Sequence, residues 1–427
     1  MNILISSFRD IAYVTSTLGG VFTSIWYFVL PPFLYWAFKA LWMDHVIRGY
    51  WRSVDKVILE IIPPQNIEKS PKLMESFFNG IHGVITTIPN NEIYIQGRFI
   101  EWFSLELVGD SGKIHFYIHG PRSDRDLVEA NIYAQYPDAQ IVEADDYTKE
   151  VPRLVPNKKW EIWGADAELS GENESLPIKT YMRFQEDVTG KMIDPLSSVL
   201  EILGNLKPSQ KVWFQIIITP IKEVEALKKG KEFIEVLTKR KTKPKSTVER
   251  IMNDAGDVLG NIIKGFSKMP EFATAEEKKE EQPLEFRLTP GEREKLKALE
   301  ENVGRNFFKT KIRFVYIGTR DNWDKPVVVG GFWGAMKQFS DMHSAGISIY
   351  DPTKTYAWYF MTKTRLRYRQ RILFQRYVDR DWTGKKFDMS TAELATIFHM
   401  PDMSAMAPSI PRVEAKLGGA PANLPIK

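Results

Sequence analysis

The sequence contains no cysteine. Without thiolates the chain cannot form a cysteine-ligated zinc site, an iron–sulfur cluster or a cysteine nucleophile. The absence agrees with a reducing compartment, but disulfide-free exported proteins are common, so it does not identify one. The excess of positive over negative charge is also small, because the 427 residues carry a net charge of only +4. Any basic contact with nucleic acid or lipid must therefore be local.

Motifs for metal and nucleotide binding are missing as well. The six histidines are scattered, and the one close pair, His115 and His119, has no acidic residue at ligand spacing beside it. Residues 109–113 and 384–386 contain glycine and lysine, but neither stretch matches the pattern G-x-x-x-x-G-K-[ST] of a phosphate-binding loop. We therefore expect no metal, no cofactor and no catalytic residues, and we predict that the chain is not an enzyme.

Residues 11–38 contain no charged residue and many aromatic and aliphatic ones. This run is long enough to cross a bilayer, for which about 20 apolar residues suffice. The basic start and the small-residue cleavage site of a signal peptide are absent. The sequence therefore predicts a retained transmembrane helix within residues 1–45, kinked or interrupted at Pro31-Pro32.

The flanks of this run predict its orientation. Lys39, Arg48, Arg52 and Lys56 follow it, whereas only Arg9 and the amino terminus precede it. Because cytoplasmic flanks carry the excess of basic residues, the large carboxy-terminal part is expected in the cytoplasm. We predict a single-pass protein of the cell inner (cytoplasmic) membrane, with membrane lipid as the partner of its single span.

The block 46–150 shows the order β-α-β-β-α-β. The predicted strands cover 57–62, 100–108, 113–118 and 139–143, and the predicted helices cover 70–83 and 125–136, with Ser70 as the first N-cap. A hairpin turn at 109–112 joins the middle strands. This order is typical of a ferredoxin-like domain, in which two helices cover one face of a four-stranded antiparallel sheet.

A similar order returns in the block 151–360. Strands are predicted over 160–169, 177–184, 212–219, 311–318 and 346–350, and helices over 194–206 and 326–339. Residues 221–306 form a charged, mainly helical insertion with a disordered acidic and basic run near 280. The predicted fold is therefore α+β, with a transmembrane helix followed by two ferredoxin-like domains. Residues 361–427 add a basic segment, a short helix and a Pro-rich tail.

Basic residues cluster inside the insertion, at Lys239, Arg240, Lys241, Lys243 and Lys245. Residues 247–268 follow with apolar side chains at helical spacing, which predicts an amphipathic helix. Such a pair fits an anionic membrane surface, but an apolar stripe more often docks on protein. We favour protein docking and keep lipid contact as the alternative.

The densest cationic segment contains Arg365, Arg367, Arg369 and Arg371, which alternate with other residues. An extended segment would place four guanidinium groups on one face, whereas a helix would spread them around its axis. A solvated or structural role is favoured, contact with protein or membrane comes next, and contact with DNA comes last. After this segment, Ser390 and Glu393 form a capping box that starts a helix.

Four stretches resemble a known family. They are Phe-Ser-Leu-Glu-Leu-Val at 103–108, Ala-Gln-Tyr-Pro-Asp-Ala at 134–139, Ser-Thr-Ala-Glu-Leu-Ala-Thr-Ile-Phe-His-Met-Pro at 390–401, and Pro-Ala-Asn-Leu-Pro at 421–425. The chain resembles the membrane-anchored, non-ATPase amino-terminal region of bacterial coupling-protein-like or HerA-like ATPases of type IV secretion and conjugation systems. The resemblance excludes every nucleotide-binding residue of that family.

The resemblance implies a non-enzymatic scaffold that docks a separate P-loop ATPase in a type IV secretion or conjugation-like transfer system. Ring-shaped partners of this kind predict a homo-oligomer, namely a hexamer. The alternative is a membrane-anchored nucleic-acid-binding protein that uses the basic patches 239–245 and 365–371. A steep loss of DNA affinity with salt would favour the alternative, because neutralised phosphates release counterions.

Overall fold

The computed structural model describes residues 2–64, 71–171, 176–184, 194–222, 234, 289–340, 344–401 and 410–411, without the side chains of 2–25 and 29. The chain divides into two compact units, Met1–Asp55 with Thr86–Glu101 and Lys56–Ile85 with Trp102–Lys427. Several predicted features lie outside the described residues. These are the N-cap Ser70, the basic cluster 239–245, the amphipathic helix 247–268 and the tail from residue 412.

The first unit is built on one long helix, α1 (Asn2–Ser53), and on a π-helical turn, η1 (Glu92–Gln96). The indole nitrogen of Trp42 donates a hydrogen bond to the carbonyl oxygen of Tyr94 at 2.8 Å. This contact holds the π-helical turn against the carboxy-terminal part of α1.

The predicted transmembrane helix was wrong. Among the described helices, none combines the length and the apolar character that crossing a membrane requires. Residues 11–38 lie within α1 and lack charge, but Ser, Thr, Gly, Tyr, Trp and the pair Pro31-Pro32 fill many of their positions. Freedom from charge is a weaker property than high mean hydropathy, and the prediction relied on freedom from charge.

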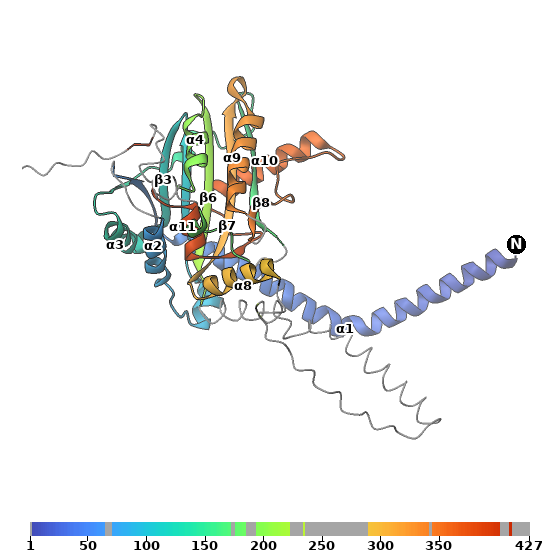
Figure 1. Ribbon diagram of the computed structural model, residues 1–427. Coiled ribbons are helices and arrows are strands. Elements are labelled where there is room, and N and C mark those ends of the chain that lie inside the picture. The colour runs from blue at the N-terminus through green and yellow to red at the C-terminus, as the bar shows by residue number, and fades with distance from the viewer. Residues whose placement is uncertain are drawn as a thin grey trace, which may run out of the picture. The chain divides into compact units, whose positions relative to one another are not determined.

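The second unit contains one large antiparallel sheet, for which the described residues supply nine strands (Figure 1). The strands are β1 (Lys56–Ile62), β2 (Phe103–Asp110), β3 (Lys113–Pro121), β4 (Gln140–Glu143), β5 (Trp160–Ser170), β6 (Gln210–Pro220), β7 (Phe307–Thr319), β8 (Gly346–Ile349) and β9 (Phe387–Ser390). Their order across the sheet is β4-β1-β3-β2-β6-β7-β5-β8, and β9 pairs with β7. The central strands are rich in apolar residues, many of them β-branched or aromatic, and are buried on both faces.

The prediction of two ferredoxin-like domains was also wrong. The predicted order of helices and strands occurs in the first half of the chain, and in the second half apart from the strand predicted at 177–184. However, an antiparallel ladder between β2 and β6 runs from the pair Phe103 and Ile218 to the pair Asp110 and Lys211, and it joins the halves into one sheet. Separate domains would expose the apolar edges of β2 and β6, which favours aggregation. Their pairing buries both edges.

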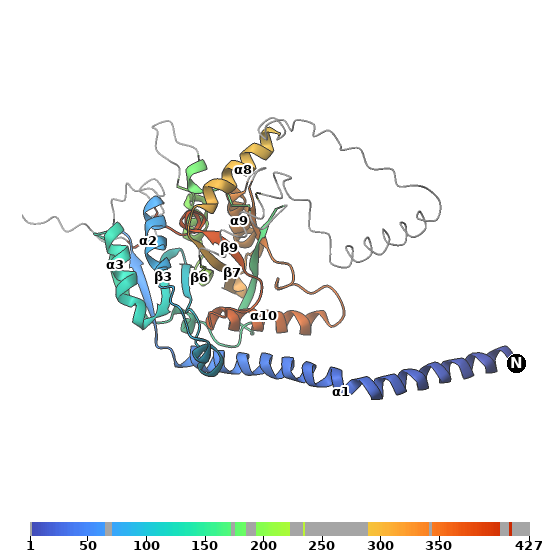
Figure 2. The same ribbon diagram turned by 90° about the horizontal axis from the view of Figure 1, so that it is seen from below.

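Helices cover both faces of this sheet (Figure 2). One face carries α2 (Lys72–His82), α3 (Arg125–Gln135), α4 (Ser197–Gly204), α9 (Lys325–Met336) and α11 (Thr391–Ile397), while the other carries α10 (Thr362–Val378). The other helices of the second unit within the described residues are α8 (Pro290–Val303) and the 3-10 turns η2 (Arg122–Asp124), η3 (Tyr147–Glu150), η4 (Tyr181–Arg183), η5 (Arg320–Asn322) and η6 (Lys337–Phe339). The predicted strand 177–184 was wrong, because a single bridge and η4 occupy it.

The two faces follow from the alternation of side chains along each strand. Phe214 of β6 and Phe314 of β7 pack against Phe332 of α9 in the larger apolar core. Trp213 of β6 points the other way and stacks on Tyr377 of α10, with ring centroids 5.1 Å apart. The face beneath α10 is therefore a separate, smaller core.

The carboxy-terminal helix is part of the main core. The predicted capping box was confirmed, because Ser390 and Glu393 exchange the expected hydrogen bonds at the start of α11. Every residue of α11 is buried. Burial raises the pKa of the Glu393 carboxyl group, which also accepts a hydrogen bond from the backbone nitrogen of Ile178 at 2.9 Å. Residues 390–400 therefore belong to the folded sheet unit and not to the tail.

Candidate functional site

A row of polar residues crosses the sheet on the face toward α10. Glu106 of β2 lies opposite Gln215 of β6, Gln215 lies opposite Arg313 of β7, and Arg313 lies opposite Asp166 of β5. None of the four is more than 1% exposed. An isolated buried charge is destabilising by several kcal/mol, so the partners of these groups decide their role.

Arg380 neutralises one end of the row. Its guanidinium donates to Glu106 at 3.1 and 3.2 Å and to Asp146 at 2.7 and 3.1 Å. Tyr147 also donates to the Glu106 carboxylate, at 2.7 Å. Burial opposes the charge of Glu106, but the charge and hydrogen bonds of Arg380 outweigh burial and lower the pKa of Glu106. Glu106 is therefore an ionised partner of Arg380.

The backbone of Arg380 adopts a conformation that favours glycine. Its φ is +48°, one residue after the C-cap Asp379 of α10. A left-handed conformation is unfavourable for an L-residue by roughly 1–2 kcal/mol. The charge-assisted hydrogen bonds to Glu106 and Asp146 offset this strain, and they explain why arginine occupies a position where helices commonly end in glycine.

The other end of the row is closed by a second ionic cluster. Asp166 accepts hydrogen bonds from Lys311 and from Arg313, each at 2.9 Å. Gln215 joins the two clusters, because it accepts from Arg313 at 3.0 Å and donates to Glu106 at 2.9 Å. These five residues and Arg380 are buried and satisfy one another's hydrogen bonds and charges. We interpret this ionic network as structural, since a buried carboxylate that is paired in this way is a poor general base.

In the part of the chain that the structure describes, no group of three His, Asp or Glu residues is placed to hold a metal ion. His119 lies near the ionic network, and burial together with the charge of Arg380 lowers the pKa of its imidazole to about 4. His115 instead contacts Glu60 at 2.6 Å. The close histidine pair of the sequence therefore divides between two different environments.

The four arginines singled out in the sequence lie on a helix. Of the two conformations left open, the helical one is present, and α10 contains six basic residues and no acidic one. Arg365 and Arg369 share one side of α10, and Arg367 and Arg371 share the opposite side, because residues four apart are neighbours on a helix. For the exposed Arg365, Arg367 and Arg371, no ion pair is found with any described residue. They are available for contact with a partner.

A loop rich in exposed aromatic residues leads into α10. Its large apolar side chains, together with one from α10, are Tyr356, Trp358, Tyr359, Phe360, Met361 and Tyr368. Trp358 is 77% exposed, although burial of a side chain of this size is strongly favourable. We define these six residues, with Arg365, Arg367, Arg369 and Arg371, as the aromatic–arginine surface.

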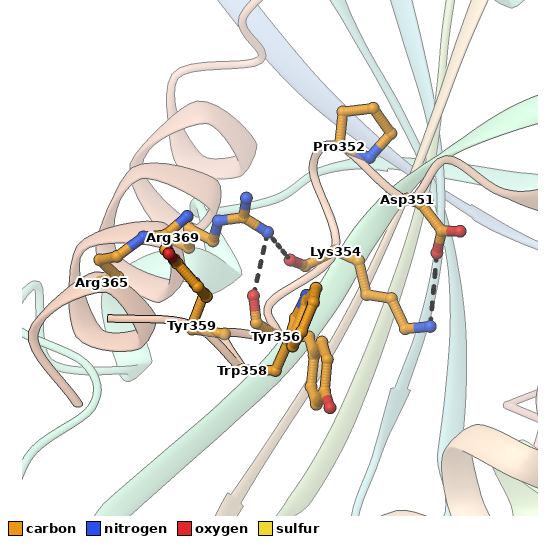
Figure 3. Close-up of a pocket in the computed structure, with 9 residues that line it drawn as sticks. Asp351, Pro352, Lys354, Tyr356, Trp358, Tyr359, Arg365 and Arg369 are labelled. Atoms are coloured by element: carbon orange, nitrogen blue, oxygen red, sulfur yellow. Dashed lines mark hydrogen bonds and ion pairs between the residues drawn. The ribbon is translucent and has the colours of Figure 1, made fainter. Parts of the chain in front are cut away.

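An open cavity of about 670 Å³ lies within this surface (Figure 3). Tyr356, Trp358 and Tyr359 line it from the loop, and Arg365 and Arg369 line it from α10. Both backbone contacts of Arg369 are visible in Figure 3, which shows its guanidinium reaching from the helix to the loop. The cavity therefore combines aromatic rings with guanidinium groups in one concave site.

Arg369 differs from its neighbours because it positions the loop. Its Nη1 atom donates to the carbonyl oxygens of Lys354 at 3.1 Å and Tyr356 at 3.0 Å. Lys354 also pairs with Asp351 at 3.4 Å, on the rim of the cavity. The predicted group of four equivalent arginines is thus divided, with three exposed cations and one cation that holds the shape of the cavity.

Both features beneath and beside α10 were missed in the sequence, although each leaves a signal. The buried row consists of single polar residues inside apolar strands, such as Gln215 within Phe-Gln-Ile and Arg313 within Ile-Arg-Phe. The loop residues 356–361 form an aromatic run with no helical or strand period, directly before a basic helix. Polar residues inside buried strands and aromatic residues inside loops are the signals for such features.

The fold and this surface define a class: a mixed α/β protein with one large antiparallel sheet, a buried ionic network and an exposed aromatic loop beside a basic helix. The chain belongs to a family described as a domain of unknown function (DUF8128), whose profile matches residues 52–412. No curated protein matches the sequence.

Proposed function

We propose that the chain is a non-enzymatic scaffold protein that binds a macromolecular partner at the aromatic–arginine surface. The observation that carries this proposal is the exposure of Trp358, Tyr359 and Phe360 beside Arg365, Arg367 and Arg371 of α10, which form no ion pair with the described residues. Trp, Tyr and Arg are the residues that contribute most to binding energy at protein interfaces. Contiguous exposed apolar patches are rare on monomeric proteins and mark interaction sites.

The support beneath the surface suits a binding role. The carboxy-terminal half of α10 is held to the sheet by Leu373, Phe374 and Tyr377, and Arg380 fixes the end of the helix to Glu106. The amino-terminal half, which carries Arg365, is exposed. A rigid support reduces the entropic cost of binding, because the surface is already ordered before the partner arrives.

The resemblance to the amino-terminal regions of coupling-protein-like ATPases extends this proposal. It suggests that the scaffold positions a separate P-loop ATPase of a type IV secretion or conjugation-like system. Support for this part of the proposal comes from the sequence stretches at 103–108, 134–139, 390–401 and 421–425. Residues 390–400 belong to the core, whereas the stretch 421–425 lies outside the described residues, so a chain that ends at residue 412 removes that stretch and leaves α11 intact.

The test is affinity purification of the full chain from its native cell after cross-linking, with partners identified by mass spectrometry. Three forms are compared: the natural chain, the double variant Trp358→Ser/Tyr359→Ser, and a chain that ends at residue 412. We expect a P-loop ATPase with the natural chain. Its loss from the double variant would assign docking to the surface, and its loss from the shortened chain would assign docking to the tail.

Two outcomes contradict the proposal. One is the recovery of the same partners, in the same amounts, with the natural chain and the double variant, because the surface would then bind no protein partner. The other is ATP hydrolysis by the purified chain that survives removal of contaminating ATPases, which would contradict a non-enzymatic role.

A further inference from the structure

We infer that the aromatic–arginine surface binds single-stranded nucleic acid, with a base stacked in the cavity and phosphates on the arginines of α10. This inference rests on the proposed function, because it names the chemical class of a partner for the same surface. Its occupant is identified by two properties of the site, the charge of the helix and the arrangement of the rings.

The charge of α10 matches a chain of phosphates. The helix carries six basic side chains and no acidic one. Arg365, Arg367 and Arg371 are exposed, with Arg365 on one side of the helix and Arg367 and Arg371 on the other. The planar guanidinium donates two parallel hydrogen bonds to a phosphate. Within the described residues that line the cavity, Asp351 is the single acidic side chain, and it is paired with Lys354. The site is therefore electropositive where a polyanion would approach.

The rings supply the second property. Trp358 and Tyr359 have ring centroids 6.0 Å apart at an interplanar angle of 64°, so each presents a face in a different direction. Both rings are largely exposed and both line the cavity that Arg365 closes on the helix side. Bases stack on such rings without sequence preference, because every base has a π-face. The volume of about 670 Å³ has room for a nucleotide.

The strand must be single. In a duplex the faces of the bases are covered by their neighbours, so a ring that needs a base face can reach only an unpaired, unstacked nucleotide. A positively charged track with aromatic side chains is the usual arrangement for binding one strand. Arg369 acts here as a positioning residue, since both of its recorded hydrogen bonds hold the loop that carries the rings.

An anionic membrane surface shares the phosphate chemistry but makes a different demand on the rings. Lipid binding places aromatic side chains at the headgroup level as outward-pointing anchors, and it has no need of a cavity between a ring and a guanidinium. The position of Trp358 and Tyr359 in the wall of the cavity therefore favours a nucleotide. Binding to lipid vesicles is therefore measured in the same experiment as the competing result.

The experiment is fluorescence anisotropy of a labelled oligonucleotide of 20 thymidines with the full chain over a series of salt concentrations. A 20-base-pair duplex and vesicles of phosphatidylcholine and phosphatidylglycerol are titrated in parallel. The variants are Trp358→Ala and Arg365→Ala, with Tyr133→Ser as matched control, because Tyr133 is an exposed aromatic residue on α3, across the sheet. The melting temperature of each variant shows whether it is folded.

We expect the oligonucleotide to bind more tightly than the duplex or the vesicles. Trp358→Ala should weaken binding by about 5- to 150-fold, which is the loss expected for one base stack. Arg365→Ala should lower the slope of log affinity against log salt by about 0.7, as expected for one phosphate contact on a single strand. Tyr133→Ser should change neither quantity.

Three results would overturn the inference. They are absence of oligonucleotide binding at low salt, binding that neither Trp358→Ala nor Arg365→Ala weakens, and vesicle binding without oligonucleotide binding. In each case the proposed scaffold function can still hold, because the cross-linking experiment detects protein partners of the same surface independently. Loss of those partners in the Trp358→Ser/Tyr359→Ser variant, together with no oligonucleotide binding, would leave a protein-docking surface.

Discussion

Two groups of arginines lie at opposite ends of α10 and behave in opposite ways. Arg380, just after the helix, is buried and bound to two carboxylates, whereas Arg365, at its start, is exposed and has no ion pair among the described residues. Burial forces a guanidinium to find partners inside the protein, while exposure leaves it for a partner outside. The same residue type therefore fixes the helix at one end and presents it at the other.

The largest change in the free energy of unfolding is expected when the buried Arg380 is replaced. Arg380→Met should lower the free energy of unfolding by about 3–5 kcal/mol, because it leaves the Glu106 carboxylate buried without its cation. Arg365→Met should change it by less than about 0.5 kcal/mol. Urea denaturation measures both. Adding Glu106→Gln to the first variant should recover part of the loss, and no recovery would mean that the strain or the packing of Arg380 decides its role.

Lowering the pH probes the same network through His119. Burial and Arg380 lower its folded pKa from 6.5 to about 4, so below pH 6.5 the unfolded state takes up a proton that the folded state refuses. The free energy of unfolding should therefore fall as the pH drops from about 6.5 to 4, by on the order of 3 kcal/mol. His119→Gln should remove the part of this loss above pH 4.5, where ordinary carboxyl groups are still ionised. An unchanged pH profile in that variant would contradict this origin.

Gly384 offers a smaller disturbance of the second ionic cluster. Its φ is +102°, and a side chain there would lie 2.9 Å from the Lys311 ammonium that binds Asp166. Gly384→Ala should lower the free energy of unfolding by roughly 1–3 kcal/mol through backbone strain and displacement of Lys311. Thermal unfolding checks this. Gly304→Ala is the control, because its site has open space around it.

The smallest effect on stability is expected at the exposed end. Trp358→Ser and Arg371→Ala should each change the free energy of unfolding by less than about 0.5 kcal/mol, because both side chains are exposed. A stability loss above about 1 kcal/mol would show that the surface packs against part of the folded chain instead of serving a partner. The same denaturation assay as for Arg380→Met gives this comparison directly.

Local patterns in the sequence predicted much of the secondary structure. The turn at 109–112 and the capping box of Ser390 and Glu393 depend on neighbours in the chain, and both were confirmed. The pairing of β2 with β6 was not predicted, because it joins residues about 100 positions apart and no local periodicity records it. The anchor prediction failed because an uncharged run was treated as an apolar one.

The arginine segment shows why the site was harder to predict. Arg365 to Arg371 alternate with a period of two, which is the period of a strand. The buried residues of α10 are Gln370, Leu373, Phe374 and Tyr377, and their spacing is that of a helix. Packing on the sheet therefore fixed the conformation, while the exposed charges carried a pattern without structural meaning. The buried partners of Arg380 could not be predicted from an isolated polar residue in a strand.

The polar row also determines which alignment of the strands is allowed. Successive side chains of β6 and β7 point to opposite faces of the sheet, so a slip of two residues would keep every apolar side chain on its own face. The same slip would move Gln215 away from both Glu106 and Arg313 and would leave buried charges without their neighbours. The row across β2, β6, β7 and β5 thus serves as an alignment mark, which selects one register when the two halves of the chain meet during folding.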